Sequence, residues 1–178
     1  GPAGFSFAEV TRAVGVSPAA PYRHYKDRDA LMADIARRGF EMFSVRLLQG
    51  WNEGQPDALS AFKAVGQGYL AFAREEPAYF AAMFEARLPK DASRELSQAT
   101  DNAFAVLRQA CEALIAQLPA GKRPPALMMA LHVWAMAHGI AALFGRSDSA
   151  RRNVPMSPED LLEANMLIYL DGLGLGPN

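Results

Sequence analysis

The sequence feature that most constrains the fold of this chain is the N-terminal segment SFAEVTRAVGVSPAAPYRHYKDRDAL. Ser6 and Glu9 have the S-x-x-E spacing of a capping box, in which each side chain satisfies a free backbone N–H at a helix start. Gly15 follows about two helical turns later, and glycine ends a helix in the left-handed conformation at little steric cost. Ser17 and Pro18 then supply a favourable cap and first residue for another helix. The segment therefore predicts a helix-turn-helix.

The second helix of this unit, expected over residues 18–25, has a surface suited to nucleic acid. It contains no acidic residue, and the small residues at its start let the backbone approach a partner closely. A helix N-terminus also favours anions by itself. Donors to phosphate follow at Tyr22, Arg23, His24 and Lys26. This composition is typical of a helix that enters the DNA major groove.

The run GVSPAAPYRHYKDRDAL resembles the signature of the TetR family of bacterial transcription regulators. Turn, cap, aromatic pair and basic residue match it in register. Thr11 departs from the small alanine common in such units, and Pro21 departs from the usual leucine or isoleucine. The family places one more helix before Ser6, so the first helix of the head is expected to be missing from these residues. The competing interpretation is an ordinary helical corner of an all-α protein.

The expected DNA contacts fall within residues 17–28. Ala19 and Ala20 are expected at base edges, where alanine contacts a thymine methyl group. The basic and aromatic residues after them are expected to position phosphates, with Arg23 able to reach a base or the backbone. The predicted DNA-binding set is Ser17, Pro18, Ala19, Ala20, Tyr22, Arg23, His24, Lys26 and Arg28.

The rest of the chain is expected to be helical throughout. Alanine, leucine and methionine are plentiful while β-branched residues are sparse. We predict an all-α fold with a DNA-binding head and connecting helix at residues 1–48 and a ligand-binding and dimerisation body at residues 49–178. The predicted helices after the head's turn are 28–48, 58–74, 78–86, 93–118, 126–144 and 158–173.

Charge and cysteine content agree with a DNA-binding protein of the cytoplasm. The net charge is −1, but residues 1–40 carry six Lys or Arg against four acids, a net charge of +2 at the head. The single cysteine, Cys111, cannot form an internal disulfide, which suits a reducing compartment. Residues 124–144 approach the length of a membrane span. Two histidines and a glycine near the middle favour a buried helix instead, and no membrane partner is expected.

A second resemblance lies in the helix predicted at 126–144. Trp134, His138 and Gly139 form a W-x-x-x-H-G motif, similar to one in a C-terminal domain class of the same family. In that family the last two helices of each subunit pair into a four-helix dimer interface, and small residues here allow close helix approach. Two recognition helices also need a fixed spacing to read a palindromic operator. The expected interface residues are Trp134, His138, Gly139 and Leu167.

The body's aromatic and methionine side chains are either simple core or the lining of a ligand cavity. The family resemblance implies a small effector that releases a repressor from its operator. A cavity is expected among helices 58–74, 93–118 and 126–144, with a mostly apolar ligand, because the candidate lining offers no unpaired Arg or Lys. The predicted ligand-binding residues are Phe72, Phe104, Cys111, Met128 and His132.

A catalytic or metal site is not evident. His132 and His138 are six residues apart, about 240° around a helix, so they do not face the same way. No Glu-x-x-His pair, H-E-x-x-H motif or phosphate loop is present. We therefore expect no enzyme activity, cofactor or metal. The alternative is an all-α small-molecule-binding protein or metal-dependent bundle enzyme with a chance helix-turn-helix-like corner.

Overall fold

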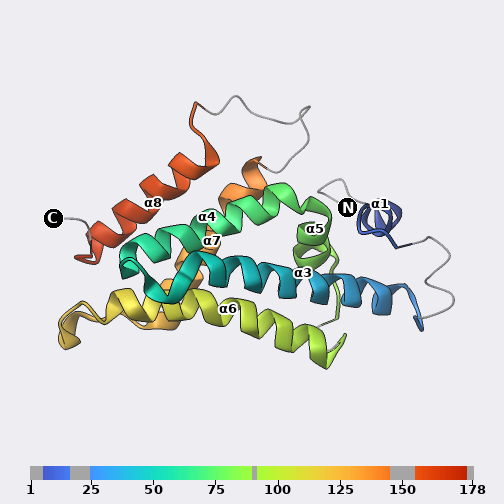
Figure 1. The fold of residues 1–178 in the computed structure, drawn as a ribbon, viewed down its shortest axis with the longest axis horizontal. Helices are drawn as coiled ribbons and strands as arrows, with labels where there is room; N and C mark the ends of the chain where they lie inside the picture. Colours follow the sequence, from blue (N-terminus) through green and yellow to red (C-terminus); the bar gives the residue numbers. More distant parts are fainter. Residues whose placement is uncertain (1–5, 17–24, 90–91, 145–154, 176–178) are drawn as a thin grey trace.

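The computed structural model describes residues 6–16, 25–89, 92–144 and 155–175. Within these ranges it contains seven α-helices and no strand (Figure 1). The predicted all-α fold is confirmed. The helices are α1 (Phe7–Ala13), α3 (Arg28–Trp51), α4 (Ala58–Glu75), α5 (Pro77–Glu85), α6 (Arg94–Ile115), α7 (Ala126–Phe144) and α8 (Pro158–Gly172), with 3₁₀ turns at Asn52–Gly54 and Ala120–Lys122.

The helix starts follow the local chemistry of the sequence. The Ser6 backbone N–H donates to Glu9 Oε2 at 2.6 Å, and the Glu9 N–H donates to Ser6 Oγ at 3.3 Å, which confirms the capping box of α1. Gly15 adopts a φ of +74° at the turn after α1. The later caps each accept a hydrogen bond from the N–H three residues ahead: Asp27 for α3, Asp57 for α4, Ser93 for α6 and Ser157 for α8.

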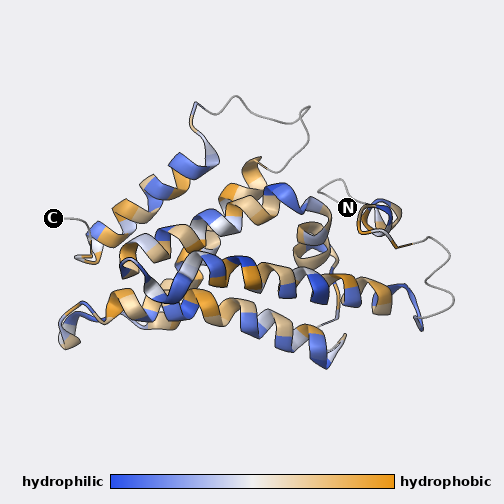
Figure 2. Cartoon of the chain, in the orientation of Figure 1, coloured by the Kyte–Doolittle hydropathy of each residue, from blue (hydrophilic) through white to orange (hydrophobic). Residues whose placement is uncertain are grey.

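The long helix α3 runs through the molecule and packs against α4, α5 and α6 (Figure 1). Helix α7 packs on α4 and α6, and α8 covers α4 and α7. Figure 2 shows hydrophilic and hydrophobic bands alternating along α3 and α6, as expected for helices with one buried face. The chain thus forms a bundle with α3 as its longest element.

Two hydrophobic clusters divide the interior. The larger one joins α3, α4, α6, α7 and α8, while a smaller one holds α1 against α3 and α5. Figure 1 shows α1 beside α5 at one end of α3, away from α8. The buried members of the smaller cluster are Val10, Leu31, Met32, Ile35, Ala36 and Ala82. One helix, α3, therefore contributes side chains to both the head and the body.

The observed end of α3 lies beyond the predicted one. The helix continues to Trp51 because this side chain is buried in the main core, only 6% exposed. Asn52 then ends it in the left-handed conformation, with a φ of 41°. The helix also passes close to α4, where a Cβ on Gly50 would meet the Ala64 carbonyl oxygen at 2.7 Å. The domain boundary predicted at residue 48 therefore falls inside α3.

Candidate ligand cavity and DNA-reading head

Most of the predicted DNA-binding residues fall outside the described part of the chain. Lys26 and Arg28 are described, and both are exposed at the start of α3. The Arg28 guanidinium carbon lies 4.2 Å from the centre of the Phe7 ring, an arrangement that holds this cation beside α1. The predicted DNA-binding residues that lie outside the described ranges are Ser17, Pro18, Ala19, Ala20, Tyr22, Arg23 and His24.

An acidic centre anchors the segment that follows them. The Tyr25 hydroxyl donates to Asp34 Oδ2 at 2.7 Å, and Arg37 and Arg38 both pair with the same carboxylate, at 2.8 and 2.9 Å. Burial opposes ionisation of Asp34, but the hydrogen bonds from Tyr25 and Arg37 outweigh it and hold the pKa of the carboxyl below its usual value. Asp34 thus ties Tyr25 to α3.

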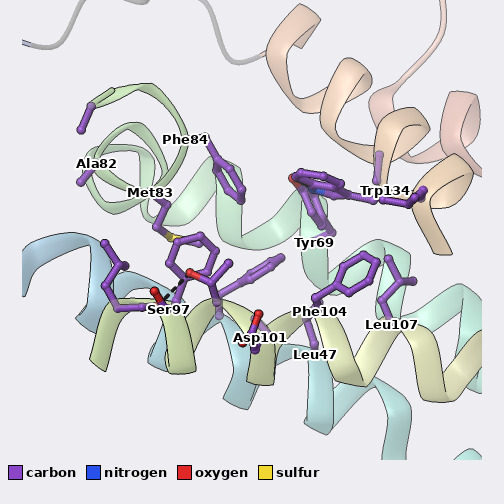
Figure 3. Close-up of a pocket in the computed structure, with 18 of the residues that line it drawn as sticks. Leu47, Tyr69, Ala82, Met83, Phe84, Ser97, Asp101, Phe104, Leu107 and Trp134 are labelled. Atoms are coloured by element: carbon purple, nitrogen blue, oxygen red, sulfur yellow. Dashed lines mark hydrogen bonds between the residues drawn. The ribbon is translucent and has the colours of Figure 1, made fainter. Parts of the chain in front are cut away.

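A cavity of about 730 Å³ lies between α3, α4, α5, α6 and α7 (Figure 3). This volume falls in the range of small-molecule sites. It lies among the three helices where a cavity was expected, with α3 and α5 as further walls. The aromatic and large aliphatic lining residues are Phe40, Phe43, Leu47, Val65, Tyr69, Met83, Phe84, Leu88, Leu96, Phe104, Leu107, Leu131, Val133 and Trp134.

A hydrogen-bonded group occupies the side of the cavity formed by α4 and α7. The Tyr69 hydroxyl lies 2.8 Å from His138 Nδ1 and accepts a hydrogen bond from Trp134 Nε1 at 3.3 Å. Burial raises the pKa of Tyr69 and lowers the pKa of His138, so both groups are neutral at neutral pH. The three side chains form an uncharged polar group; Tyr69 and Trp134 belong to the cavity lining, whereas His138 contacts them from outside the lining.

His138 is surrounded by aromatic rings. Its imidazole stacks on Phe80 with a centroid separation of 5.5 Å, and the edge contact with Phe84 has a separation of 4.9 Å. Trp134 and Tyr69 complete the surroundings at 6.2 and 6.4 Å. These rings fix the imidazole orientation and explain the low pKa, because apolar neighbours disfavour the charged form.

The charged groups and the aliphatic hydroxyls of the cavity lie on its α5 and α6 sides. Ser97, Thr100 and Asp101 line it from α6, and Arg87 lines it just after α5. Among the described lining residues, the charged ones are Arg87 and Asp101. The mostly apolar ligand was predicted because the candidate lining contained no unpaired Arg or Lys. The observed lining contains Arg87, so this premise was wrong.

The family comparison decides which class of protein carries this cavity. Residues 62–167 match the family described as "Tetracyclin repressor-like, C-terminal domain". The chain belongs to the TetR-like family. This match covers most of the body, from α4 into α8. The resemblance expected from the N-terminal signature is confirmed at the level of the family, and the family is one of regulators.

A solved structure supports the fold of the TetR-like chain. "Structure of a protein with unknown function from Rhodococcus sp. RHA1" matches with a TM-score of 0.70 and 26% sequence identity. The match covers 95% of this chain and 84% of that chain. No curated protein matches the chain.

The structure places the predicted ligand-binding residues in three different environments. Phe104 lines the cavity. Phe72 and Cys111 are instead packed in the main core, and burial raises the pKa of the Cys111 thiol to about 12. Met128 and His132 lie on the exposed side of α7, where His132 Nδ1 is 3.1 Å from the Tyr169 hydroxyl. The cavity lining therefore retains Phe104 and excludes the other four.

The predicted dimer residues are also divided. Trp134 and His138 face inward to Tyr69, because α7 turns this side of the motif toward α4. Gly139 is exposed, and no atom lies within 4 Å of the place a Cβ would occupy. Leu167 is half-buried on α8. Gly139 is thus the motif residue that faces outward.

Helix α7 exposes an unusually apolar outer side. By length and composition it is also the one helix among the described residues long and apolar enough to cross a membrane, and 33% of its most apolar 18-residue window is buried. It packs against α4, α6 and α8, which places it within the bundle. The large exposed apolar residues on α7 and α8 are Leu127, Met128, Leu131, Leu143 and Ile168.

The observed site also contains residues that were not predicted to bind ligand. Tyr69 was counted among the body's aromatics, and its partner His138 sits four residues after Trp134, so both members of the motif face α4. Asp101 and Arg87 carried no signal, since isolated charges usually mark solvated faces. No cluster of three His, Cys, Asp or Glu suited to a metal ion occurs within the described ranges.

Proposed function

We propose that this TetR-like protein is a dimeric, cytoplasmic DNA-binding repressor, released from a palindromic operator by a small ligand bound in the cavity. Family membership supports the regulatory class. The specific observation that carries the proposal is that one helix, α3, forms part of both the cavity wall and the base of the head.

The two ends of α3 provide a physical link between ligand and DNA. Phe40, Phe43 and Leu47 line the cavity. Ile35 and Leu31, five and nine residues before Phe40 on the same helix, are buried in one cluster with Val10 of α1. A helix is a rigid element, so a ligand that displaces the cavity end of α3 also moves the head.

Helix α5 supplies a second link. Ala82 lines the cavity and is buried in the head cluster together with Val10 of α1. Met83, its neighbour, lines the cavity and touches α3 close to Gly39. The head therefore rests on two of the helices that a bound ligand contacts.

The dimer is proposed to form through the outer sides of α7 and α8. Leu143 and Ile168 are 66% and 74% exposed, a poor arrangement for a helix pair that faces water. Gly139 lies on this side without a neighbour, which leaves room for a close approach of another helix. A two-fold dimer through this face sets the spacing between the two heads, as reading of a palindromic site requires.

DNA contacts are proposed for the segment 17–28. Lys26 and Arg28 are exposed beside it and carry the charge that phosphate binding needs. Removal of one phosphate-contacting cation is expected to lower the salt slope of DNA binding by about one.

The experiment that tests the function is a binding titration with the double-stranded DNA upstream of the protein's own gene. We expect saturable binding that is stronger than binding to unrelated DNA of equal length. The double variant Tyr22→Ala, Lys26→Ala should bind both DNAs more weakly. Equal binding of both DNAs by the wild-type protein, or an unchanged affinity in the double variant, would contradict the assignment.

A further inference from the structure

We propose that the effector is a protonated amphipathic amine, with its ammonium group against Asp101 and its apolar body among the aromatic side chains of the cavity; this rests on the proposed role of the cavity as the effector site. The chemistry of the α6 wall carries the proposal. That wall accepts hydrogen bonds, is anionic and lies next to aromatic faces.

Two hydroxyl groups on α6 donate their protons in hydrogen bonds to carbonyl groups of the same chain segment. Thr100 Oγ1 donates to the Leu96 carbonyl at 2.9 Å, and Ser97 Oγ donates to the Ser93 carbonyl at 3.3 Å. A hydroxyl has one proton and two lone pairs, so each group presents only acceptors to a ligand.

Asp101 extends this row of acceptors. It lies one helical turn after Ser97, its side chain is exposed, and it lines the cavity together with Ser97 and Thr100. An ionised carboxylate offers only acceptors. No side-chain hydrogen bond or ion pair involves Asp101 within the described part of the chain, so its oxygens remain accessible to a ligand donor. The α6 wall therefore matches a group with several N–H donors and a positive charge.

Aromatic rings lie beside this acceptor row. Figure 3 shows Asp101 next to Phe104 on α6, with Met83 and Phe84 of α5 across the cavity. Phe84 makes an edge contact with Phe40 at a centroid separation of 5.5 Å, and Phe104 makes one with Trp134 at 6.3 Å. Aromatic faces attract cations and exclude water, and they also accommodate a flat or aliphatic body.

Arg87 is the group that opposes a cation. It lines the cavity from the segment after α5, is exposed, and forms no ion pair with Asp101 within 4.0 Å. An anionic ligand on Arg87 would have to face the acceptor row of α6 across the cavity. The α6 wall supplies three acceptor groups, one of them the Asp101 carboxylate, whereas an anion finds a single guanidinium among the described lining residues. The arrangement therefore favours the cation.

A matched series of fluorescent probes tests this inference: 1-pyrenemethylamine, 1-pyrenemethanol and 1-pyrenecarboxylate. The three share one aromatic body and differ in the charge and donors of the head group, and the amine stays protonated at neutral pH as lysine does. Dissociation constants are measured for the wild-type full chain, Asp101→Asn and Glu95→Gln. Glu95 is exposed on the first turn of α6 and is not part of the lining, so Glu95→Gln controls for the loss of one charge.

We expect the amine to bind the wild-type protein about tenfold more tightly than the alcohol, and the carboxylate to bind most weakly. Asp101→Asn should abolish the preference for the amine, while Glu95→Gln should retain it. Equal affinities of amine and alcohol, a preference that survives in Asp101→Asn, or tightest binding of the carboxylate would overturn the amine class and leave the cavity as a ligand site.

A further variant separates failure of the ligand class from failure of the site. Thr100→Trp should fill the cavity from its half-buried α6 side and weaken all three probes. If no probe binds the wild-type protein, or if Thr100→Trp leaves all affinities unchanged, both the amine class and the role of this cavity as the effector site are wrong.

Discussion

The Tyr69 hydroxyl lies 2.8 Å from His138 Nδ1 and joins α4 to α7 through a hydrogen bond at the edge of the cavity. Trp134 Nε1 donates to the same oxygen. The oxygen is therefore shared by two partners, and both lose it if the hydroxyl is removed. This relationship makes the stability and pH behaviour of the body predictable.

Tyr69→Phe should destabilise the protein by about 1–3 kcal/mol, because the Trp134 N–H and the His138 ring nitrogen both lose a partner in a mostly buried site. Urea unfolding measures the difference. Tyr79→Phe is the control, since Tyr79 is half-buried on α5 and no hydrogen bond of its hydroxyl occurs among the described residues. An equal loss in both variants would show that the hydrogen bonds of Tyr69 contribute nothing specific.

The pKa of His138 predicts a loss of stability in mild acid. Burial lowers this pKa in the folded state, so the unfolded chain binds the proton more readily. The stabilising contribution is present above the unfolded pKa, about 6.5, and is lost as the pH falls through the folded value. The free energy of unfolding should thus fall below about pH 6.5.

Two variants test the source of this acid dependence. His138→Gln should flatten the dependence of the unfolding free energy between about pH 7 and 5. His132→Gln is the matched control on the same helix, where the side chain is exposed, and should retain it. A persistent acid loss in His138→Gln would assign the effect to another group.

Gly39 permits the close packing of α3 on α5. A Cβ at this position would lie 2.8 Å from the Met83 sulfur, and Met83 lines the cavity. Gly39→Ala gains about 1 kcal/mol of helix propensity but must displace Met83, at a cost of about 1–3 kcal/mol. We expect a small net loss of stability and weaker binding of 1-pyrenemethylamine. Adding Met83→Ala should restore binding; no restoration would mean that Met83 is not the group displaced.

Gly139→Arg should convert the proposed dimer to a monomer. Among the described residues nothing lies within 4 Å of the new Cβ, so an arginine is tolerated by the subunit, but it blocks close packing of a partner on α7. Light scattering gives the mass. Gly121→Arg is the control, since Gly121 is equally unobstructed but lies in the 3₁₀ turn before α7. A dimeric Gly139→Arg variant would place the interface elsewhere.

Local features of the fold were predictable from the sequence, whereas helix orientation was not. The capping box of Ser6 and Glu9 and the start of α7 at Ala126 depend on a few neighbouring residues. The end of α3 depends on the burial of Trp51 against distant helices, which local composition does not reveal. The sequence therefore predicted the end of this helix at residue 48, three residues before its observed end at Trp51.

The cavity lining shows the same limit. The hydrophobic pattern indicates which helices are buried, but not how each one is rotated against several neighbours. Nor does the pattern show how far along a helix a cavity extends: Phe104 and Cys111, two turns apart, lie on nearly the same face of α6, but the cavity lining on this helix ends at Leu107 and Cys111 is packed in the core. Helix α7 is apolar on nearly all sides, so its hydrophobic pattern does not predict which side faces the core. His132 and Met128 lie on its exposed side. Asp101 was missed because it is exposed, as a single carboxylate on a helix usually is, and nothing in the pattern shows that it also lines a cavity.

The account depends most on coupling between the cavity and the head. By thermodynamic linkage, a ligand that weakens DNA binding must itself be weakened by DNA by the same factor. The decisive measurement is the Kd of the protein for its upstream DNA with and without saturating 1-pyrenemethylamine, together with the Kd of the amine with and without that DNA. We predict that both constants rise by one common factor, about fivefold or more. A DNA affinity that is unchanged while the cavity is occupied would contradict the account.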